Sequence, residues 1–412
     1  MQTKKNVFLW VSYDFANSIV SIVFFLYFAQ WVVVDRGIAD IYFNFTFTIS
    51  ALLLLFTVPV TGFFLDKHFR RITGLRYSTI STSILYSACA LCAIFNNDIL
   101  ALVFFTLGLY TYLLTFTFYT PLIKDISEAS NRGKVSGFGV LANYTGQFVG
   151  LLFVLPFSKG IVSLFNSSPR TETLLPAVIL FTILTLPMLI WFKEPKKEKV
   201  NFRFKDEINK VFSETKKLFI FPSVGLFMLA YFLFNDAILT ASNNFPIFLQ
   251  QVWGVSDTIK TYILLGILFT SGIGGLISGI VADRYGHKRI LLFVISGWII
   301  ILPLVGFITN FTLFVVTTTI MGFWFGATWA VSRSVMSYLV PPQAHNLGFA
   351  YFGLVERASS FVGPIVWGIT LSSLASIGSD RYRFATLAVT GFIVVGLYFL
   401  IKVRSDRSQS TT

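Results

Sequence analysis

Five ionisable side chains stand inside long apolar stretches of this 412-residue chain: Asp14, Asp236, Arg333, Glu356 and Arg357. A charge near the centre of a lipid bilayer costs roughly 2.5–3.5 kcal/mol, so such a residue normally faces a cavity or a partner. Glu356 is a candidate for exchanging a proton, and Arg333 or Arg357 for holding a carboxylate through the guanidinium fork. Asp14 or Asp236 would hold an amine. This set of residues predicts a proton or substrate site within a membrane.

The same charges have a second interpretation, which the sequence leaves open. A rise of 1.5 Å per helical residue places four of them in one half of the membrane and Asp236 near the middle or beyond. The four would then form ion pairs that close one side of the protein and break when it opens. Glu356 and Arg357 are adjacent and point about 100° apart on a helix, so we expect them to have different partners.

Two pairs of uncharged polar residues accompany these charges. Tyr13 and Asn17 are four residues apart, as are Tyr231 and Asn235, so each pair shares one helix face. Hydroxyl and amide groups on such a face would hydrogen-bond a polar zwitterion. Alternatively, they hydrogen-bond neighbouring helices and hold a bundle together, as Asn often does in membranes.

The elements that must position these residues are membrane-spanning helices. Hydrophobic residues make up 55% of the chain and charged residues only 12%, whereas a soluble protein carries about 25% charge. A helix needs about 20 apolar residues to cross the hydrocarbon core. Twelve spans are expected at Phe8–Val33, Tyr42–Leu65, Gly74–Phe95, Ile99–Ile123, Val135–Pro156, Leu174–Phe192, Phe219–Phe248, Ile259–Ala282, Ile290–Ile308, Thr312–Val340, Leu347–Leu374 and Tyr382–Val403.

The distribution of Lys and Arg predicts the orientation of these spans. Twenty-four of them fall in the gaps on one side or at the span ends that border these gaps, and six on the other, namely Arg36, Lys159, Arg170, Lys260, Arg381 and Arg383. The positive-inside rule therefore places both termini in the cytoplasm. We expect an integral, multi-pass protein, of the cell (inner) membrane if it is bacterial. The net charge of +13 arises in these loops, and no nucleic-acid-binding motif accompanies it.

The chain is built as two related halves. The spacing Gly62-x-x-x-Asp66 recurs as Gly279-x-x-x-Asp283, the Tyr13/Asn17 pair recurs as Tyr231/Asn235, and Phe148-Val149-Gly150 recurs as Phe361-Val362-Gly363, at offsets of 213 to 218 residues. We expect a six-helix bundle at residues 1–192, a basic cytoplasmic linker at 193–218 and a second bundle at 219–412. Repeats of this kind are typical of transporters that bind substrate where the repeats meet.

The alignment of the halves also shows where they differ. Ser18 aligns with Asp236, and Asn143 with Glu356. Two of the best candidates for chemistry are therefore features of the second half alone.

The loop after the eighth span carries a recognisable motif. It contains Gly279, Asp283, Arg284, Gly286, Lys288 and Arg289, and it resembles the loop signature of the major facilitator superfamily. The first-half copy has Gly62, Asp66 and Arg70, with Phe69 where the family usually has Gly. The resemblance implies an all-α polytopic membrane protein, in which twelve transmembrane helices form two pseudo-symmetric six-helix bundles. It also implies that these loops lock one conformational state.

A narrower resemblance rests on four other strings. They are Ser12-Tyr13-Asp14-Phe15-Ala16-Asn17-Ser18, Phe234-Asn235-Asp236, Ser332-Arg333-Ser334 and Gly363-Pro364. Together they are similar to the vacuole effluxer family, which comprises the autophagy-linked vacuolar amino-acid exporters of fungi and their bacterial relatives. Relatives often have Gly after the Asp at 236, where this chain has Ala237. The resemblance implies efflux of a small polar solute, an amino acid among them.

The sequence thus predicts a secondary active transporter, and not an enzyme. It would work by alternating access, with coupling to protons as a hypothesis. An exporter of drugs, peptides or other metabolites, and a membrane receptor or scaffold on a transporter fold, remain as alternatives. We find no P-loop, metal-ligand set or nucleophile–base arrangement, so we expect no cofactor and no metal. The expected partners are a small-molecule substrate, H+ and membrane lipid, and the expected state is a monomer.

Overall fold

The computed structural model describes residues 2–67, 70–127, 132–194, 222–340 and 345–404. Within these ranges all regular structure is helical, and eleven helical segments are long and apolar enough to cross a membrane. The expected polytopic all-α fold is confirmed. Residues 195–218 of the predicted linker at 193–218 lie outside the described ranges.

Contacts group the chain into two compact units, which we describe separately. The first comprises Met1–Asn201 with Asn243–Tyr262, and the second comprises Phe202–Ser242 with Ile263–Thr412. The first unit therefore includes the last part of α10 (Pro222–Trp253) and the start of α11 (Asp257–Tyr285). Its own helices are α1 (Gln2–Val23), α2 (Asp40–Lys67), α3 (Arg71–Ile94), α4 (Asp98–Tyr119), α5 (Ile123–Ile126), α6 (Arg132–Ser158), α7 (Pro169–Glu172) and α8 (Leu174–Trp191).

Helix α1 is the central element of the first unit. It contacts both α6 and α8, and it continues through two π-helical turns, η1 (Phe24–Phe28) and η2 (Trp31–Asp35). Near its start, Trp10 stacks on Tyr119 of α4 with 4.7 Å between ring centroids. A π turn holds one extra residue, so it rotates the side chains that follow it relative to those before it.

The second unit is built from the helices of the second half. Three of its pairs pack side by side: α12 with α16, α12 with α13, and α15 with α16. Its helices are α10 (Pro222–Trp253), α11 (Asp257–Tyr285), α12 (His287–Phe307), α13 (Phe311–Leu339), α14 (His345–Ala358), α15 (Gly363–Ser373) and α16 (Arg381–Lys402).

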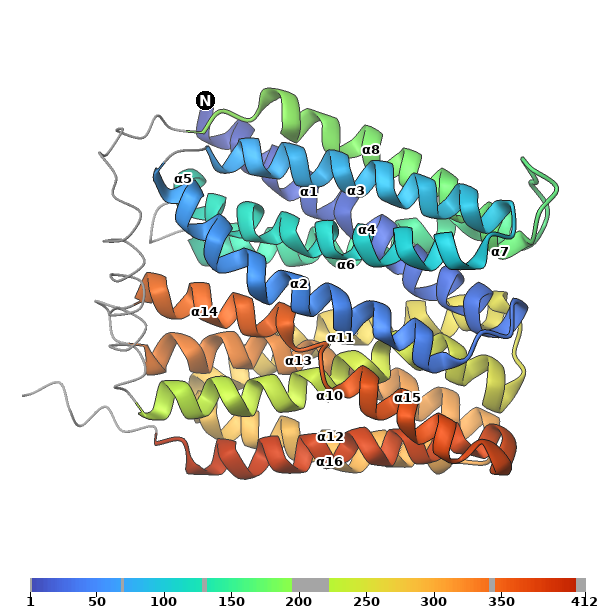
Figure 1. The fold of residues 1–412 in the computed structure, drawn as a ribbon. Helices are drawn as coiled ribbons and strands as arrows, with labels where there is room; N and C mark the ends of the chain where they lie inside the picture. Colours follow the sequence, from blue (N-terminus) through green and yellow to red (C-terminus); the bar gives the residue numbers. More distant parts are fainter. Residues whose placement is uncertain (1, 68–69, 128–131, 195–221, 341–344, 405–412) are drawn as a thin grey trace, which may run out of the picture. The chain divides into compact units, whose positions relative to one another are not determined.

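The eleventh span is broken, and the expectation of one helix over Leu347–Leu374 was wrong. Helix α14 ends at Ala358 and α15 begins at Gly363; Figure 1 shows the orange α14 giving way to the red α15 at this point. Pro364 has no N–H to donate and disfavours helical geometry at the residue before it. A proline suits the first turn of a new helix instead, where the structure places it.

Large apolar side chains stay exposed on both units. Phe56 is 74% exposed in the first unit, and Phe269 is 71% exposed in the second. Contiguous exposed apolar surface on this scale would associate in water, whereas acyl chains solvate it. Some of the 47 Phe residues lie on such faces, while others, such as Phe24 and Phe105, are buried in the core.

Helices α11 and α13 meet through glycines. A Cβ added to Gly274 would lie 2.1 Å from the carbonyl oxygen of Phe323, and one added to Gly326 would lie 1.8 Å from the carbonyl oxygen of Ser271. Without Cβ atoms at these points the two backbones approach closely. Such contacts are a main source of helix association in lipid, where the hydrophobic effect between helices is absent.

We predict that Gly274→Ala lowers the free energy of unfolding by about 1–3 kcal/mol, since overpacking a tight interface has costs of this size. The control is Gly272→Ala on the same helix, because nothing lies within 4 Å of a Cβ there. Thermal unfolding in detergent measures both. Equal melting temperatures for the two variants would contradict the packing described here.

Candidate functional site

Asp14 lies in the first unit, on the face of α1 that meets α6. Its Oδ1 accepts a hydrogen bond from Asn143 Nδ2 of α6 at 3.1 Å. The Asn143 oxygen in turn accepts from Gln147 Nε2 at 2.8 Å. The carboxylate therefore belongs to a chain of amide side chains that joins two helices of the same unit.

Tyr13 and Asn17 are buried beside Asp14, at 0% and 1% exposure. The Tyr13 hydroxyl shares a hydrogen bond of 2.7 Å with Thr79 Oγ1 of α3. Among the described residues, neither amide atom of Asn17 has a hydrogen-bond partner. Sequence analysis left open whether these residues bind a ligand or join helices. Tyr13 joins two helices, while Asn17 keeps an unused donor and an unused acceptor.

The equivalent pair in the second unit shows the opposite division. Asn235 Nδ2 donates to Ser359 Oγ at 2.5 Å and to the carbonyl of Glu356 at 3.3 Å, and Asn235 Oδ1 accepts from Trp329 Nε1 at 3.1 Å. The hydroxyl of Tyr231 is buried without a partner in the described structure. Each repeat therefore leaves one member of its Tyr/Asn pair unsatisfied.

Asp236 is fully buried and accepts hydrogen bonds at the break in the eleventh span. Its Oδ2 accepts the backbone N–H groups of Val362 at 3.0 Å and Gly363 at 2.7 Å. The first amides of a helix lack partners within the helix, and a carboxylate is favoured at that positive end. Asp236 thus caps α15.

The arginine and glutamate candidates meet on α13 and α14. Arg333 Nη2 lies 3.2 Å from Glu356 Oε1, with the two side chains 46% and 25% exposed. Both residues belong to the second unit, so this ion pair forms within one bundle. Arg357, the next residue, is half-buried.

The loop motif after α11 occupies a tight turn between two helices. Gly286 has a φ of +97°, which favours glycine. Asp283 is 78% exposed on the last turn of α11, and Lys288 donates to the carbonyls of Ile401 at 2.9 Å and Val403 at 2.5 Å. Arg284 and Arg289 flank this turn on α11 and α12.

The first-half copy of the motif is described only in part. The backbone of Gly62 and Asp66 belongs to α2, but the side chain of Asp66 lies outside the described residues. Arg70 is exposed and precedes the first residue of α3.

Sequence analysis missed a charged network in the first unit, centred on Arg170 and Asp257. Arg170 of α7 donates to Asp35 at 2.5 Å and, through two nitrogens, to Asp257 at 2.8 and 3.1 Å. Lys260 Nζ lies 2.7 Å from Asp257 and also donates to Gln30 and Gln250.

The positive and negative charges of this network balance each other. It contains two carboxylates and two cations, and the Lys260 side chain is 0% exposed with an acceptor for each of its three N–H groups. A buried ammonium requires this degree of pairing. Lys260 and Arg170 had been counted only as loop charges, and the spacing Asp257–Lys260 on one helix face was the available signal.

The α6–α7 loop positions Arg170 for this network. The buried carboxylate of Glu172 accepts the backbone N–H groups of Leu164, Phe165 and Ser167 at 2.9–3.0 Å. These bonds fix the backbone of the loop, so Arg170 is held in position to pair with Asp35 and Asp257.

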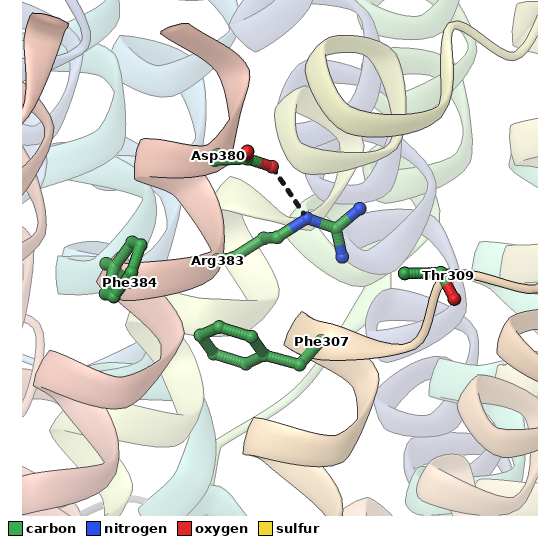
Figure 2. Close-up of a pocket in the computed structure, with 5 residues that line it drawn as sticks. All are labelled: Phe307, Thr309, Asp380, Arg383 and Phe384. Atoms are coloured by element: carbon green, nitrogen blue, oxygen red, sulfur yellow. Dashed lines mark hydrogen bonds and ion pairs between the residues drawn. The ribbon is translucent and has the colours of Figure 1, made fainter. Parts of the chain in front are cut away.

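A cavity of about 340 Å³ in the second unit lies away from all these residues. Phe307, Thr309, Asp380, Arg383 and Phe384 line it (Figure 2). Arg383 pairs with Asp380 at 3.1 Å and donates to the carbonyls of Gly306 at 2.6 Å and Ile308 at 3.1 Å. A cation at the carbonyl end of α12 is a stabilising helix cap, so this pocket has a structural explanation.

Comparison with known proteins finds similarity over most of the chain. The sequence profile described as vacuole effluxer Atg22 like matches residues 120–411. An uncharacterized MFS-type transporter of Bacillus subtilis, YxiO, is 22% identical, covering 94% of this chain and 93% of its own. A multi-drug resistance efflux pump PmrA homolog of Lactococcus lactis is 23% identical over 96% and 93%.

A further relative and two solved structures extend the comparison. The proton-coupled antiporter flippase LtaA of Staphylococcus saprophyticus is 25% identical over 70% of this chain and 69% of its own. A variant of the nucleoside transporter NupG aligns with a TM-score of 0.76 at 13% identity, covering 97% of this chain and 99% of its own. A D-xylose–proton symporter aligns at 0.73 and 12%, covering 100% and 99%. These two structures show the fold.

The buried network predicts a large effect of one substitution. Asp257→Asn leaves Lys260 and Arg170 without their shared carboxylate, and removing one partner of a buried pair costs about 3 kcal/mol or more. Thermal unfolding of the purified protein measures the loss. The control is Asp98→Asn, which removes the partly exposed Arg36–Asp98 pair and should cost at most about 1 kcal/mol. A smaller loss for Asp257→Asn than for Asp98→Asn would refute the described burial.

Proposed function

Because the chain belongs to the vacuole effluxer Atg22-like family of major facilitator transporters, we propose that it exports a small polar solute, in the first instance an amino acid, by proton-coupled alternating access. It is a multi-pass membrane transporter and not an enzyme. The substrate class and the coupling ion are the proposal.

The observation that carries the proposal is the unsatisfied polar chemistry inside the spans. Asn17 and Tyr231 are buried, and the Asn17 amide and the Tyr231 hydroxyl have no hydrogen-bond partner within the described chain. Leaving a buried polar group unpaired costs about 1–3 kcal/mol. In a purely structural role this cost in free energy would stay uncompensated. A polar ligand that supplies the missing hydrogen bonds would compensate it.

The charge pair on α13 and α14 suits the ends of an amino acid. Arg333 is exposed and already forms one charge-assisted contact, with Glu356 at 3.2 Å. A substrate carboxylate would compete with Glu356 for the guanidinium, whose planar fork fits carboxylates. Protonation of Glu356 would weaken its hold on Arg333. Proton binding and substrate binding are then thermodynamically linked, whichever binds first.

Two relatives bear on the choice of coupling ion and substrate. The name of one describes a proton-coupled antiporter, and the name of another describes a multi-drug efflux pump. The first supports protons as the coupling ion. The second keeps export of an apolar cation as the competing function, so any substrate panel must include one.

Purified protein in liposomes tests the proposal. We expect uptake or release of at least one amino acid from a panel to follow an imposed pH gradient, and Glu356→Gln to abolish that dependence because the amide cannot exchange a proton. Asp236→Asn should also reduce it. The control is Asp380→Asn, whose side chain is 66% exposed and lies at the structural pocket.

Three outcomes separate the candidates in this assay. Flux that ignores the gradient in the wild type and both variants would refute proton coupling. Transport of a lipophilic dye cation, with no amino acid moved, would favour drug export. No flux of any member of the panel would refute both substrate classes tested.

The orientation in the membrane is part of the proposal: both termini lie in the cytoplasm. In a background with Cys89→Ser and Cys92→Ser, we expect Lys159→Cys to react with an impermeant maleimide added to intact cells and Arg404→Cys to react only after lysis. Both positions are exposed, so accessibility reports the membrane side. The reverse pattern would invert the topology.

A further inference from the structure

Two consecutive residues of α10 hold the two sides of the break in the eleventh span. Asn235 donates to the carbonyl of Glu356 and to Ser359, at the end of α14, with distances of 3.3 and 2.5 Å. Asp236 accepts from the amides of Val362 and Gly363, at the start of α15, with distances of 3.0 and 2.7 Å. The geometry of the break therefore depends on α10.

The first half provides an internal control for this arrangement. Ser18 is the residue aligned with Asp236, and its hydroxyl donates to the carbonyl of Phe15 within its own helix. Phe148-Val149-Gly150 aligns with Phe361-Val362-Gly363, and there α6 runs unbroken from Arg132 to Ser158. The half with a carboxylate at this position has the broken helix, and the half with a hydroxyl does not.

Electrostatics explains the association. A broken helix exposes amides that have no partner in lipid. A carboxylate satisfies them with charge-assisted hydrogen bonds, which are about twice as strong as neutral ones. A Cβ at Gly363 would lie 2.8 Å from Asp236 Oδ1, so glycine is required for α15 to approach the carboxylate this closely.

The second carboxylate oxygen of Asp236, Oδ1, is the atom that can bind a proton. Asp236 is 0% exposed, its Oδ2 takes both amides, and no hydrogen bond of normal geometry reaches its Oδ1 within the described residues. The Thr240 hydroxyl and the Phe361 amide act on the carboxylate as well. An anionic oxygen buried without a partner is unfavourable. A proton on that oxygen removes the unpaired charge.

Other charged groups lie on the helices that pack against Asp236. Helix α14 carries Glu356 and Arg357, and α13 carries Arg333, which pairs with Glu356. Helix α10 itself carries Tyr231. Helix α15 has no titratable side chain, and α16, which approaches α10 at Gly396, has only Tyr398 between residues 384 and 401.

We propose that Asp236 Oδ1 is a proton-binding site whose occupancy controls the cap on α15, and hence the mobility of the break. The incoming proton forms an O–H bond at Oδ1 and cancels the carboxylate charge. The bonds from Val362 and Gly363 then become neutral and weaker, and the first turn of α15 is released. This deepens the proposed proton coupling, on which it rests, by giving the proton a structural consequence.

Hydrogen–deuterium exchange of the full-length protein in detergent or nanodiscs tests the proposal. After correction for intrinsic exchange, we expect the amides of Val362 and Gly363 to exchange about tenfold faster at acidic than at mildly alkaline pH, since 1.4 kcal/mol corresponds to a factor of ten. Asp236→Asn should exchange fast at both pH values. Glu356→Gln should keep the pH response, and Asp380→Asn should match the wild type.

The outcomes are distinct from those of the transport assay. A wild-type exchange rate at Val362 and Gly363 that does not change with pH would overturn the proposal, as would loss of the response in Glu356→Gln with retention in Asp236→Asn. Gradient-independent transport with exchange that follows Asp236 would support this site and refute proton coupling. The wild-type pH series needs no variant to fold.

Discussion

Inside a bilayer, every backbone amide, carbonyl and charge must find its partner within the protein. The described helices obey this constraint almost everywhere, because an intact helix satisfies its own backbone. Where the eleventh span breaks, the constraint falls on side chains: Asp236 supplies the acceptor for α15 and Asn235 the donor for α14. Where a lysine is buried, as at position 260, three acceptors surround it. Several buried polar atoms of the described residues lack a hydrogen-bond partner, and those of Asn17, Tyr231 and Asp236 are the ones that coincide with the repeated motif positions. We therefore take these three as the candidates for ligands.

The two halves use one pattern with different chemistry. In the first, Tyr13 is bonded and Asn17 is not; in the second, Asn235 is bonded and Tyr231 is not. The first half has a serine and an unbroken helix where the second has an aspartate and a break. The apolar pattern fixes similar helix positions in the two halves, whereas single polar positions differ between them.

Much of the fold could be predicted from local pattern. The ninth span, expected at Ile290–Ile308, is the helix His287–Phe307, and the third, expected at Gly74–Phe95, is Arg71–Ile94. An apolar run of this length forms a membrane-spanning helix in lipid, so it can be assigned without knowledge of tertiary contacts. The candidate site was harder. Ion pairing among the charges that include Arg333 and Glu356 was one of two interpretations, but the sequence did not indicate which residues pair, and Lys260 was taken for a loop charge.

The sequence by itself determined the helical type of the fold, the position of most spans and the family, because hydropathy and motif spacing are properties of short segments. The tertiary structure decided which charges are paired, which helix breaks and which polar atoms remain unsatisfied. These depend on how each helix is rotated and on residues more than 100 positions apart, such as Asp236 and Gly363, separated by 127. A hydrogen bond requires its two atoms within about 3 Å, and no local pattern encodes that.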